Sequence, residues 1–291
     1  SNNGAALLET IIATDTPNGH SPASRTHWAA DQNLPLMKDK KVADVLFWVS
    51  DGAFDMRSQR ILKAFVSLMK AANIDVAILG DEERDSGDVA RRLGDDATFQ
   101  SLAKRNLATL SQYEFNKIVT TDPHAYHCLR NEYEDLDDDG VLAQGASGQA
   151  IEVLHHTTYL NQLVQQGLLK LDVFKGAKVT YHDPCYLGRY NGEYDAPREL
   201  LRSLGIEIAE MERSGFRSRC CGGGGGAPIT DIPGERRIAD MRMEDVIATD
   251  AEIVAVGCQQ CTAMLEGVVE PRPVVKDIAE ILAGQLVEEV H

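Results

Sequence analysis

Three groups of cysteines, separated by nearly equal lengths of chain, constrain the fold of this sequence more than any other feature. Cys185 is followed after 34 residues by Cys220-Cys221, and a further 36 residues lead to Cys258-x-x-Cys261. Each group follows a short apolar run that predicts a buried strand, over residues 178–181, 206–211 and 252–256. Because the carboxyl ends of parallel strands meet at one edge of a sheet, we expect the five thiols to converge there.

Strands and helices alternate along most of the chain. In the first half, apolar runs predict strands over residues 42–49, 74–79 and 116–121. Apolar stripes at helical spacing predict helices over residues 58–71, 97–111, 197–204, 234–249 and from 259 onwards, and residues 273–286 predict one more strand and helix. This alternation is typical of parallel sheets that are covered by helices on both faces. We therefore predict the α/β class, with two pseudo-symmetric parallel-sheet units packed together.

The cysteine spacing recurs in the first half of the chain with aspartates in place of thiols. These aspartates follow the three strands expected there, at Asp51, Asp85 and Asp122. The intervals between them are 33 and 36 residues, against 35 and 36 residues between Cys185, Cys221 and Cys258. Ala125 stands where the second half has the last cysteine of its Cys-x-x-Cys motif. An internal repeat explains this best, with every equivalent cysteine of the first half replaced.

The sequence divides into three segments. Residues 1–40 contain Gly and Pro residues that interrupt any period, and this predicts an extended N-terminal arm. Residues 41–140 form the expected first α/β unit, without cysteine ligands. Residues 141–291 form the second α/β unit, which carries the five cysteines.

Composition excludes several classes of protein. The 29 basic and 45 acidic residues give a net charge of −16, which would repel a phosphate backbone, so we expect no nucleic acid partner. The chain has neither a run of 18 apolar residues nor a signal peptide, which predicts no membrane span and a cytoplasmic location. Six cysteines in 291 residues are too few for a disulfide-stabilised secreted scaffold. Because the chain begins with Ser1 rather than Met, it fits a fragment, a processed product or a tagged protein, and regions outside it could bring it to the inner face of a membrane.

The residues alone leave three interpretations of the cysteines open. A Cys-x-x-Cys pair is found in redox dithiols and in half of a zinc site. Structural zinc takes four ligands, which is one fewer than the five thiols available here. Soft thiolates also hold iron–sulfur clusters, and this interpretation uses all five.

At this point the motifs resemble a known family, the cysteine-rich "CCG" domain of heterodisulfide reductase-like proteins. The resemblance rests on Cys185, Cys220-Cys221-Gly222 and Cys258-x-x-Cys261, and it covers roughly residues 25–290. Four segments are most similar to the iron–sulfur subunit of bacterial dimethylglycine demethylase, namely residues 47–55, 83–88, 181–192 and 220–229.

The resemblance implies a cofactor and a role. In this family each complete motif holds a non-cubane [4Fe–4S] cluster through five cysteines. One cluster is therefore expected here, held by Cys185, Cys220, Cys221, Cys258 and Cys261. The implied role is electron transfer between a flavin-dependent amine dehydrogenase subunit and electron-transfer flavoprotein, with FAD or FMN in those partners only. Two alternatives are a catalytic disulfide or heterodisulfide-type reductase and a structural zinc-binding interaction module.

Residues outside the five cysteines invite more ordinary interpretations. Cys128 matches no ligand position, and we interpret it as structural. His155-His156 and His182 are candidate ligands, although a hydrogen-bonded structural histidine is more common. His182 with Asp183 is also expected to surround Cys185 from outside. Arg91-Arg92 and His124 are expected to pair with the three aspartates. The glycine run 222–226 would let the backbone approach a cluster.

Overall fold

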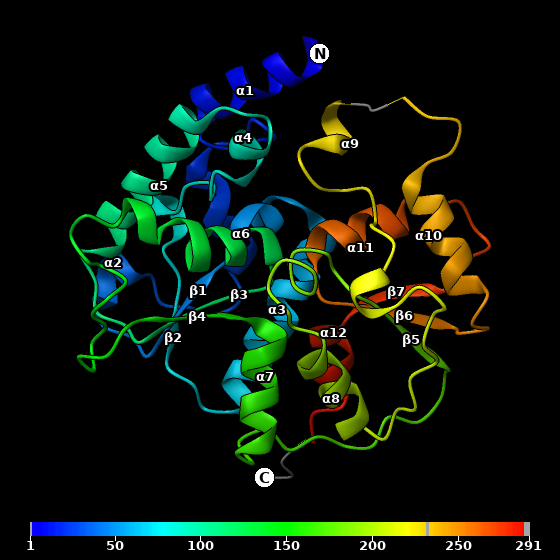
Figure 1. Cartoon of the computed structure of the whole chain (residues 1–291). Helices are drawn as coiled ribbons and strands as arrows, with labels where there is room; N and C mark the ends of the chain where they lie inside the picture. Colours follow the sequence, from blue (N-terminus) through cyan, green and yellow to red (C-terminus); the bar gives the residue numbers. More distant parts are fainter. Residues whose placement is uncertain (1, 231–232, 288–291) are drawn as a thin grey trace. The chain divides into compact units, whose positions relative to one another are not determined.

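The computed structural model describes residues 2–230 and 233–287, and it divides into two compact units (Figure 1). Each unit is assembled from segments that are far apart in the sequence. The first unit comprises Ser1–Gln59, Ile74–Leu154 and Gly224–Pro233. The second comprises Arg60–Asn73, His155–Gly223 and Gly234–His291.

The first sheet has four strands in the order β2-β1-β3-β4. Its strands are β1 (Val45–Trp48), β2 (Val76–Ala77), β3 (Lys117–Thr120) and β4 (Glu152–His155). The central strand β1 pairs in parallel with both β2 and β3, which confirms the parallel sheet expected from the sequence. All four residues of β1 are buried, as is typical of a parallel strand that is covered on both faces.

Helical segments surround this sheet. They are α1 (Asn2–Thr14), η1 (Pro22–Ala29), α2 (Met37–Lys40), η2 (Ser50–Phe54), η3 (Gly80–Glu82), α4 (Asp88–Arg92), α5 (Asp96–Leu110), α6 (Pro123–His127), η4 (Cys128–Glu132), η5 (Glu134–Leu136) and α9 (Ala227–Thr230). The helix α3 (Met56–Ala71) begins in this unit, and its residues from Arg60 onwards belong to the second. A capping residue fixes the start of α5, where the Asp95 side chain accepts a hydrogen bond from Thr98 N at 3.0 Å. Phe99 and Leu107 of this helix then pack in one core cluster with Leu46 of β1.

The N-terminal residues are helical, so the expectation of an extended arm over residues 1–40 was wrong for α1. Leu7 and Ile11 lie one turn apart and pack with Ala90 and Leu102 in a small core cluster. Burial of this apolar face stabilises the helix, whereas Pro17, Gly19, Pro22 and Pro35, which suggested an extended segment, follow it. The remainder of the arm contains the short segments η1 and α2.

The second sheet has three strands in the order β5-β6-β7. Its strands are β5 (Val179–His182), β6 (Ile253–Val256) and β7 (Val274–Asp277), and both pairings are parallel. The strand expected over residues 206–211 forms only one bridge, between Val179 and Ile208. Beyond this bridge, Glu210 binds Arg198, with Oε1 2.6 Å from Nε.

The second unit repeats the strand order of the first, with Ile208, β5, β6 and β7 in the places of β2, β1, β3 and β4. Its helices are α7 (His156–Gln165), α8 (Asp195–Ser203), η6 (Gly215–Arg217), α10 (Ile238–Ile247), α11 (Gln259–Glu266) and α12 (Ile278–Ala283). No element was expected over β4 and α7, yet Tyr159, Leu160 and Leu163 give α7 a buried apolar face. Within the ranges that the structure describes, no helix is both long enough and apolar enough to cross a bilayer.

The packing of α1 predicts a large difference between two neighbouring isoleucines. Ile11 is fully buried and Ile12 is 63% exposed. Ile11→Ala should cost roughly 2–5 kcal/mol of the free energy that holds α1 in place, since it leaves a cavity against Ala90 and Leu102. Ile12→Ala, the matched control, should change it by about 0.5 kcal/mol or less. Native-state hydrogen exchange of the α1 amides measures both values, and equal effects would contradict the helical packing.

Candidate metal centre

The five predicted cysteines come from three loops at the carboxyl edge of the second sheet. Cys185 lies in the turn after β5, and Cys220-Cys221 lies in the loop that follows η6. Cys258 and Cys261 lie at the start of α11, directly after β6. The parallel register of β5 and β6 sets His182 opposite Val256, so the loops that carry Cys185 and Cys258 leave the sheet at the same level.

Neighbouring thiols are in contact along the whole set. Cys185 is hydrogen-bonded to Cys220, Cys220 to Cys221, Cys221 to Cys261, and Cys261 to Cys258. All five are free thiols. Three of them are buried, and Cys185 and Cys220 are partly exposed. The sequence therefore predicted correctly that these five side chains would gather, as a group with one face toward solvent.

The Cys-x-x-Cys motif forms the first turn of a helix. Cys258 is the N-cap of α11, and its Sγ accepts a hydrogen bond from Cys261 N at 3.4 Å. The backbone N–H groups of the first helical turn have no helical partners and carry partial positive charge. This position places N–H donors beside the sulfur of Cys258, where they would stabilise a metal-bound thiolate.

The glycines after the cysteine pair have specific roles. Gly222 has a φ of +88°, and its N–H donates to Cys220 Sγ at 3.2 Å. A Cβ on Gly223 would lie 2.6 Å from Cγ of Gln260, so only glycine fits there. Gly224–Gly226 belong to the first unit, and only the first two glycines of the run stand beside the thiols in the second.

A buried ion pair joins the Cys185 loop to the Cys220 loop. Arg198 binds both oxygens of Asp183, with Nη1–Oδ1 at 2.7 Å and Nη2–Oδ2 at 2.8 Å. Asp183 Oδ2 also accepts from Gly215 N at 2.8 Å, and its carbonyl oxygen accepts from Ser218 Oγ at 3.2 Å. Asp183 thus connects the end of β5 to the segment that leads into Cys220. It supports the site from outside, as expected.

The shared hydrogen bonds make the thiols unequal in acidity. The bond to Cys220 raises the pKa of Cys185, whereas the bonds from Cys185 and Cys221 lower the pKa of Cys220. Bonds to Cys221 and Cys258 raise the pKa of Cys261. Thiolates packed this closely repel one another, and a cationic metal group would relieve that repulsion. The donor set, which is five sulfurs and no oxygen, suits a soft metal centre.

The equivalent edge of the first sheet carries carboxylates. Asp51 lies in η2 after β1, Asp85 follows η3 after β2, and Asp122 is the N-cap of α6 after β3. Burial raises the pKa of all three carboxyl groups, and repulsion from Asp51 raises that of Asp85 further. The predicted gathering of the three is supported by their mutual repulsion, which reaches from Asp122 to Asp51 and from Asp51 to Asp85.

The cation at this edge is Arg25, which sequence reasoning missed. Arg25 is fully buried, and its Nη1 lies 3.4 Å from Asp51 Oδ1, 3.4 Å from Glu83 Oε1 and 2.6 Å from the Ser50 carbonyl oxygen. Glu83 also accepts from Val49 N at 3.1 Å and from Ser50 N at 2.7 Å. No periodic pattern marked Arg25, because it lies in the arm that was expected to be extended.

The expected partners of the three aspartates bind mainly elsewhere. Arg92 Nε and His124 Nδ1 both contact Asp88, each at 2.9 Å. The His124 backbone N–H donates to Asp122 Oδ1 at 2.9 Å, which is the helix cap, and the charge of its side chain acts to lower the pKa of Asp122. Arg91 pairs with Glu132, at 3.6 Å. The expectation that Arg91, Arg92 and His124 pair with the three aspartates is therefore met in part by His124 and Asp122, while Asp88 and Glu132 take the closest contacts of these cations.

The remaining candidate ligands have structural surroundings. Cys128 is buried in the same core cluster as Phe99 and Leu46, and its Sγ lies 3.3 Å from Glu132 Oε2. His156 Nε2 lies 2.8 Å from the buried Asp277 Oδ1, and its other ring nitrogen lies 3.2 Å from His155. Across residues 2–230 and 233–287, three potential ligand atoms lie within 4.8 Å of one another only in His182, Cys221 and Cys261. The three aspartates do not form such a group.

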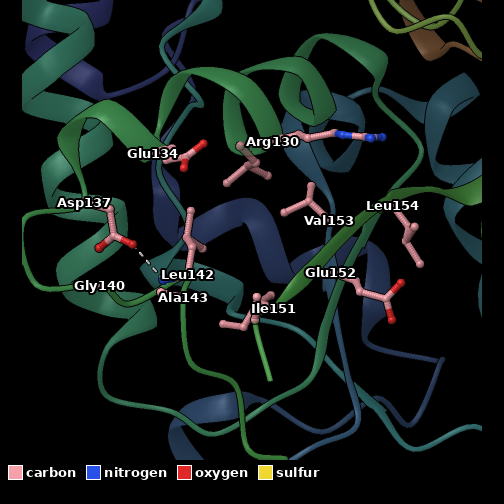
Figure 2. Close-up of a pocket in the computed structure, with 12 residues that line it drawn as sticks. Arg130, Glu134, Asp137, Gly140, Leu142, Ala143, Ile151, Glu152, Val153 and Leu154 are labelled. Carbon is pink, nitrogen blue, oxygen red and sulfur yellow. Dashed lines mark hydrogen bonds between the residues drawn. The ribbon is translucent and has the colours of Figure 1, made fainter. Parts of the chain in front are cut away.

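A separate pocket of about 560 Å³ lies in the first unit (Figure 2). Its walls include Leu129, Leu142 and the residues of β4 from Glu152 to Leu154. Asp137, at its rim, already accepts hydrogen bonds from Val141 N and Leu142 N, both at 2.8 Å. No cysteine lines this pocket, so it is not part of the metal centre.

Comparison with known proteins identifies the family. The family described as "CCG: Cysteine-rich domain" matches residues 45–130 and residues 179–266, which together are more than half of the chain. The chain belongs to this family. Two matched copies also confirm the internal repeat that the spacing of aspartates and cysteines predicted. The cysteine-rich domain is complete in its cysteines only in the second copy.

Several curated proteins are similar to this cysteine-rich chain. A "Probable membrane-anchored ferredoxin" from Chromohalobacter salexigens is 59% identical, over 97% of this chain and 42% of the relative. A "Probable iron-sulfur-binding oxidoreductase FadF" from Bacillus subtilis is 39% identical, over 89% and 36%. An "EtfAB:quinone oxidoreductase" from Syntrophomonas wolfei is 34% identical, over 91% and 38%. This chain spans about two fifths of the length of each.

The buried carboxylates of the first unit predict a pH dependence of stability. Burial raises the pKa of Glu83 from 4.5 to about 7, in spite of Arg25 and two backbone donors. The folded state then binds a proton that the unfolded state has released. The contribution of Glu83 to stability is fully present below about pH 4.5 and is lost as the pH rises through 7, by roughly 3 kcal/mol in total.

Glu83→Gln should remove the Glu83 contribution and so reduce the fall in stability, leaving the part that Asp51, Asp85 and Asp122 produce. Chemical unfolding followed from pH 4.5 to 8 measures it, with Glu114→Gln at an exposed position as the matched control. The control should keep the wild-type slope. A Glu83→Gln protein whose stability still falls by the wild-type amount over this range would contradict the assignment.

Proposed function

We propose that Cys185, Cys220, Cys221, Cys258 and Cys261 hold one non-cubane [4Fe–4S] cluster and that this chain is an electron-transfer subunit of an oxidoreductase complex. The observation that carries the proposal is the continuous contact of five free thiols at the edge of one parallel sheet. Four would suffice for zinc. The fifth favours iron and sulfide.

The surrounding residues prepare the site for such a group. The first turn of α11 presents Cys258 and Cys261 with unpaired backbone N–H groups beside them. Asp183, which is paired with Arg198, accepts hydrogen bonds from Gly215 N and Ser218 Oγ and so holds two of the three loops together. Burial of Cys221, Cys258 and Cys261 excludes water from one side, while the partial exposure of Cys185 and Cys220 leaves an edge through which a partner can exchange electrons.

When bound, the cluster supplies a one-electron redox centre. The names of the relatives, which include a ferredoxin, an iron–sulfur oxidoreductase and an EtfAB:quinone oxidoreductase, support such a role. We propose a flavin-dependent amine dehydrogenase, acting on dimethylglycine, as the electron donor and electron-transfer flavoprotein as the acceptor. FAD or FMN would be bound in those partners. We place the complex in the cytoplasm. If regions outside this chain anchor it, the complex would lie at the inner face of the membrane.

The repeat defines the functional parts of the chain. We propose residues 41–140 as a CCG unit that has lost its ligands and residues 141–291 as the unit that holds the cluster. Both matched stretches, 45–130 and 179–266, lie inside these limits, which supports the division. In this division Arg60–Asn73 belongs to the first repeat in sequence but to the second compact unit. Gly224–Pro233 belongs to the second repeat in sequence but to the first compact unit.

The ligand set predicts how iron is lost. Anaerobically purified protein should contain about four iron atoms per chain with matching sulfide. Cys221→Ala/Cys258→Ala should lose most of both, because it removes ligands from two of the three loops. Cys128→Ala, which changes an equally buried thiol in the first unit, should retain the wild-type content.

Iron and sulfide analysis with visible absorption checks this set of proteins. Full iron retention in the double variant would disprove the ligand assignment. About one zinc per chain without sulfide would favour the zinc-binding interaction module instead.

The electron-transfer role is tested by reconstitution. A dimethylglycine-oxidising flavin dehydrogenase and electron-transfer flavoprotein should exchange electrons slowly alone and at least tenfold faster when the loaded chain is added. The apo form and the Cys221→Ala/Cys258→Ala protein should give no acceleration. If the isolated loaded chain instead reduced a disulfide at enzyme-like rates, on the order of 1 per second or faster, the catalytic reductase would be the better interpretation.

A further inference from the structure

His182 is the last residue of β5, and it is buried beside the thiols with only 1% of its surface exposed. Its Nδ1 lies 2.9 Å from Nε of Arg242. Its Nε2 is also buried, and it has no hydrogen-bond partner among the described residues. A buried ring nitrogen without a partner is costly, so its surroundings require an explanation.

Arg242 determines which ring nitrogen carries the proton. A guanidinium is always charged and can only donate hydrogen bonds. The Nδ1 that faces Arg242 Nε must therefore offer its lone pair, and the proton of the neutral ring lies on Nε2. Burial, together with the neighbouring Arg242, lowers the pKa of His182 and keeps the ring neutral. Nε2 is then a hydrogen-bond donor.

Two of the thiols lie close to this ring. A ring nitrogen of His182 lies within 4.8 Å of the Sγ atoms of both Cys221 and Cys261. Since Nδ1 is occupied by Arg242, Nε2 is the nitrogen that is free to face these sulfurs. Both cysteines belong to the set that we propose as cluster ligands.

We propose that His182 is a positioning residue that donates a hydrogen bond from Nε2 to a sulfur atom of the bound cluster or of its ligands, and that Arg242 holds the ring in this orientation. The inference rests on the proposed cluster and adds a determinant of its reduction potential. A hydrogen bond to sulfur stabilises the more negative, reduced state and raises the potential.

The same geometry argues against His182 as a sixth ligand, although its distances to Cys221 and Cys261 would suit a metal site. Coordination through Nε2 needs a lone pair there, which moves the proton to Nδ1. That proton would then face Nε–H of Arg242, and two donors would meet at 2.9 Å.

Arg242 cannot easily turn away. It is fully buried, and its other nitrogens donate to the Arg213 carbonyl oxygen at 2.8 Å, to Asp245 Oδ2 at 3.2 Å and to Ser218 Oγ at 3.0 Å. These three contacts hold the guanidinium independently of the histidine. Removing the ring should therefore leave Arg242 and the loop around Ser218 in place.

The test compares two substitutions of His182 with a control in the same strand. Redox titration of the loaded chain, followed by electron paramagnetic resonance, should give a more negative midpoint potential for His182→Leu, by about 59 mV, which is a tenfold change in the one-electron equilibrium. His182→Gln keeps a donor near the position of Nε2 and should restore most of the shift. Thr180→Val removes another buried, unpartnered polar atom from β5 and should leave the potential unchanged.

Iron content and hyperfine spectra separate the remaining outcomes. All three variants should keep wild-type iron and sulfide, and protein labelled with ¹⁵N-histidine should show only weak nitrogen coupling together with an exchangeable proton near the cluster. Iron loss in His182→Leu and His182→Gln, or strong nitrogen coupling in the wild type, would identify a ligand and overturn the inference. An unchanged potential in His182→Leu with full iron content would overturn it too. A wild-type chain that assembles no cluster would refute the proposed site itself, and this is seen before any variant is compared.

Discussion

The parallel pairing of two neighbouring strands is the constraint on which both halves of this protein depend. In the second unit β5 and β6 pair with His182 opposite Val256, and in the first unit β1 and β3 pair with Trp48 opposite Thr120. Neighbouring strands lie about 4.8 Å apart, so the loops that leave their carboxyl ends begin almost in contact. Whatever side chains those loops carry must share one small volume. The chemistry of the first residues after each strand therefore decides whether the edge holds a metal group or an ion-pair network.

In the first unit a carboxylate takes the helix-capping role that a cysteine sulfur takes in the second. Asp122 caps α6 through its side chain, as Cys258 caps α11. The replacement at this position thus preserves the start of the helix while it removes a soft ligand. Around Asp51 the chain is fixed differently, because Ser50 has a φ of +57°. Glu83 accepts a hydrogen bond from the Ser50 N–H, and Arg25 donates one to the Ser50 carbonyl oxygen. These two contacts hold Ser50 in a conformation that a non-glycine residue rarely adopts.

The sequence could predict those features that repeat or alternate. Buried strands such as β1 and β6 are continuous apolar runs, and the cysteines mark where their strands end. The sheet edge and the gathering of the five thiols could therefore be predicted from the sequence. Features that depend on one contact between distant residues could not be predicted from the sequence. Arg25 meets Glu83 across 58 residues and Arg242 meets His182 across 60, and no local pattern links either pair. The helix α1 was missed because its stripe is short, and Leu7 and Ile11 are buried by contacts with distant segments such as α4 and α5.

The two units also balance charge in different ways, and this explains why only one of them suits a metal group. In the second unit the buried cations are already neutralised by carboxylates, Arg198 by Asp183 and Arg242 by Asp245. Neutral N–H groups at Gly222 and Cys261 donate to the thiols, and we propose the same role for the unpartnered Nε2 of His182. Such donors can stabilise negative sulfur without competing as counter-ions. In the first unit a guanidinium lies directly among the carboxylates, and burial drives these carboxylates toward their protonated form. A positive side chain and protonated acids both disfavour a metal cation, so the absence of cysteines at this edge and the presence of Arg25 act in the same direction.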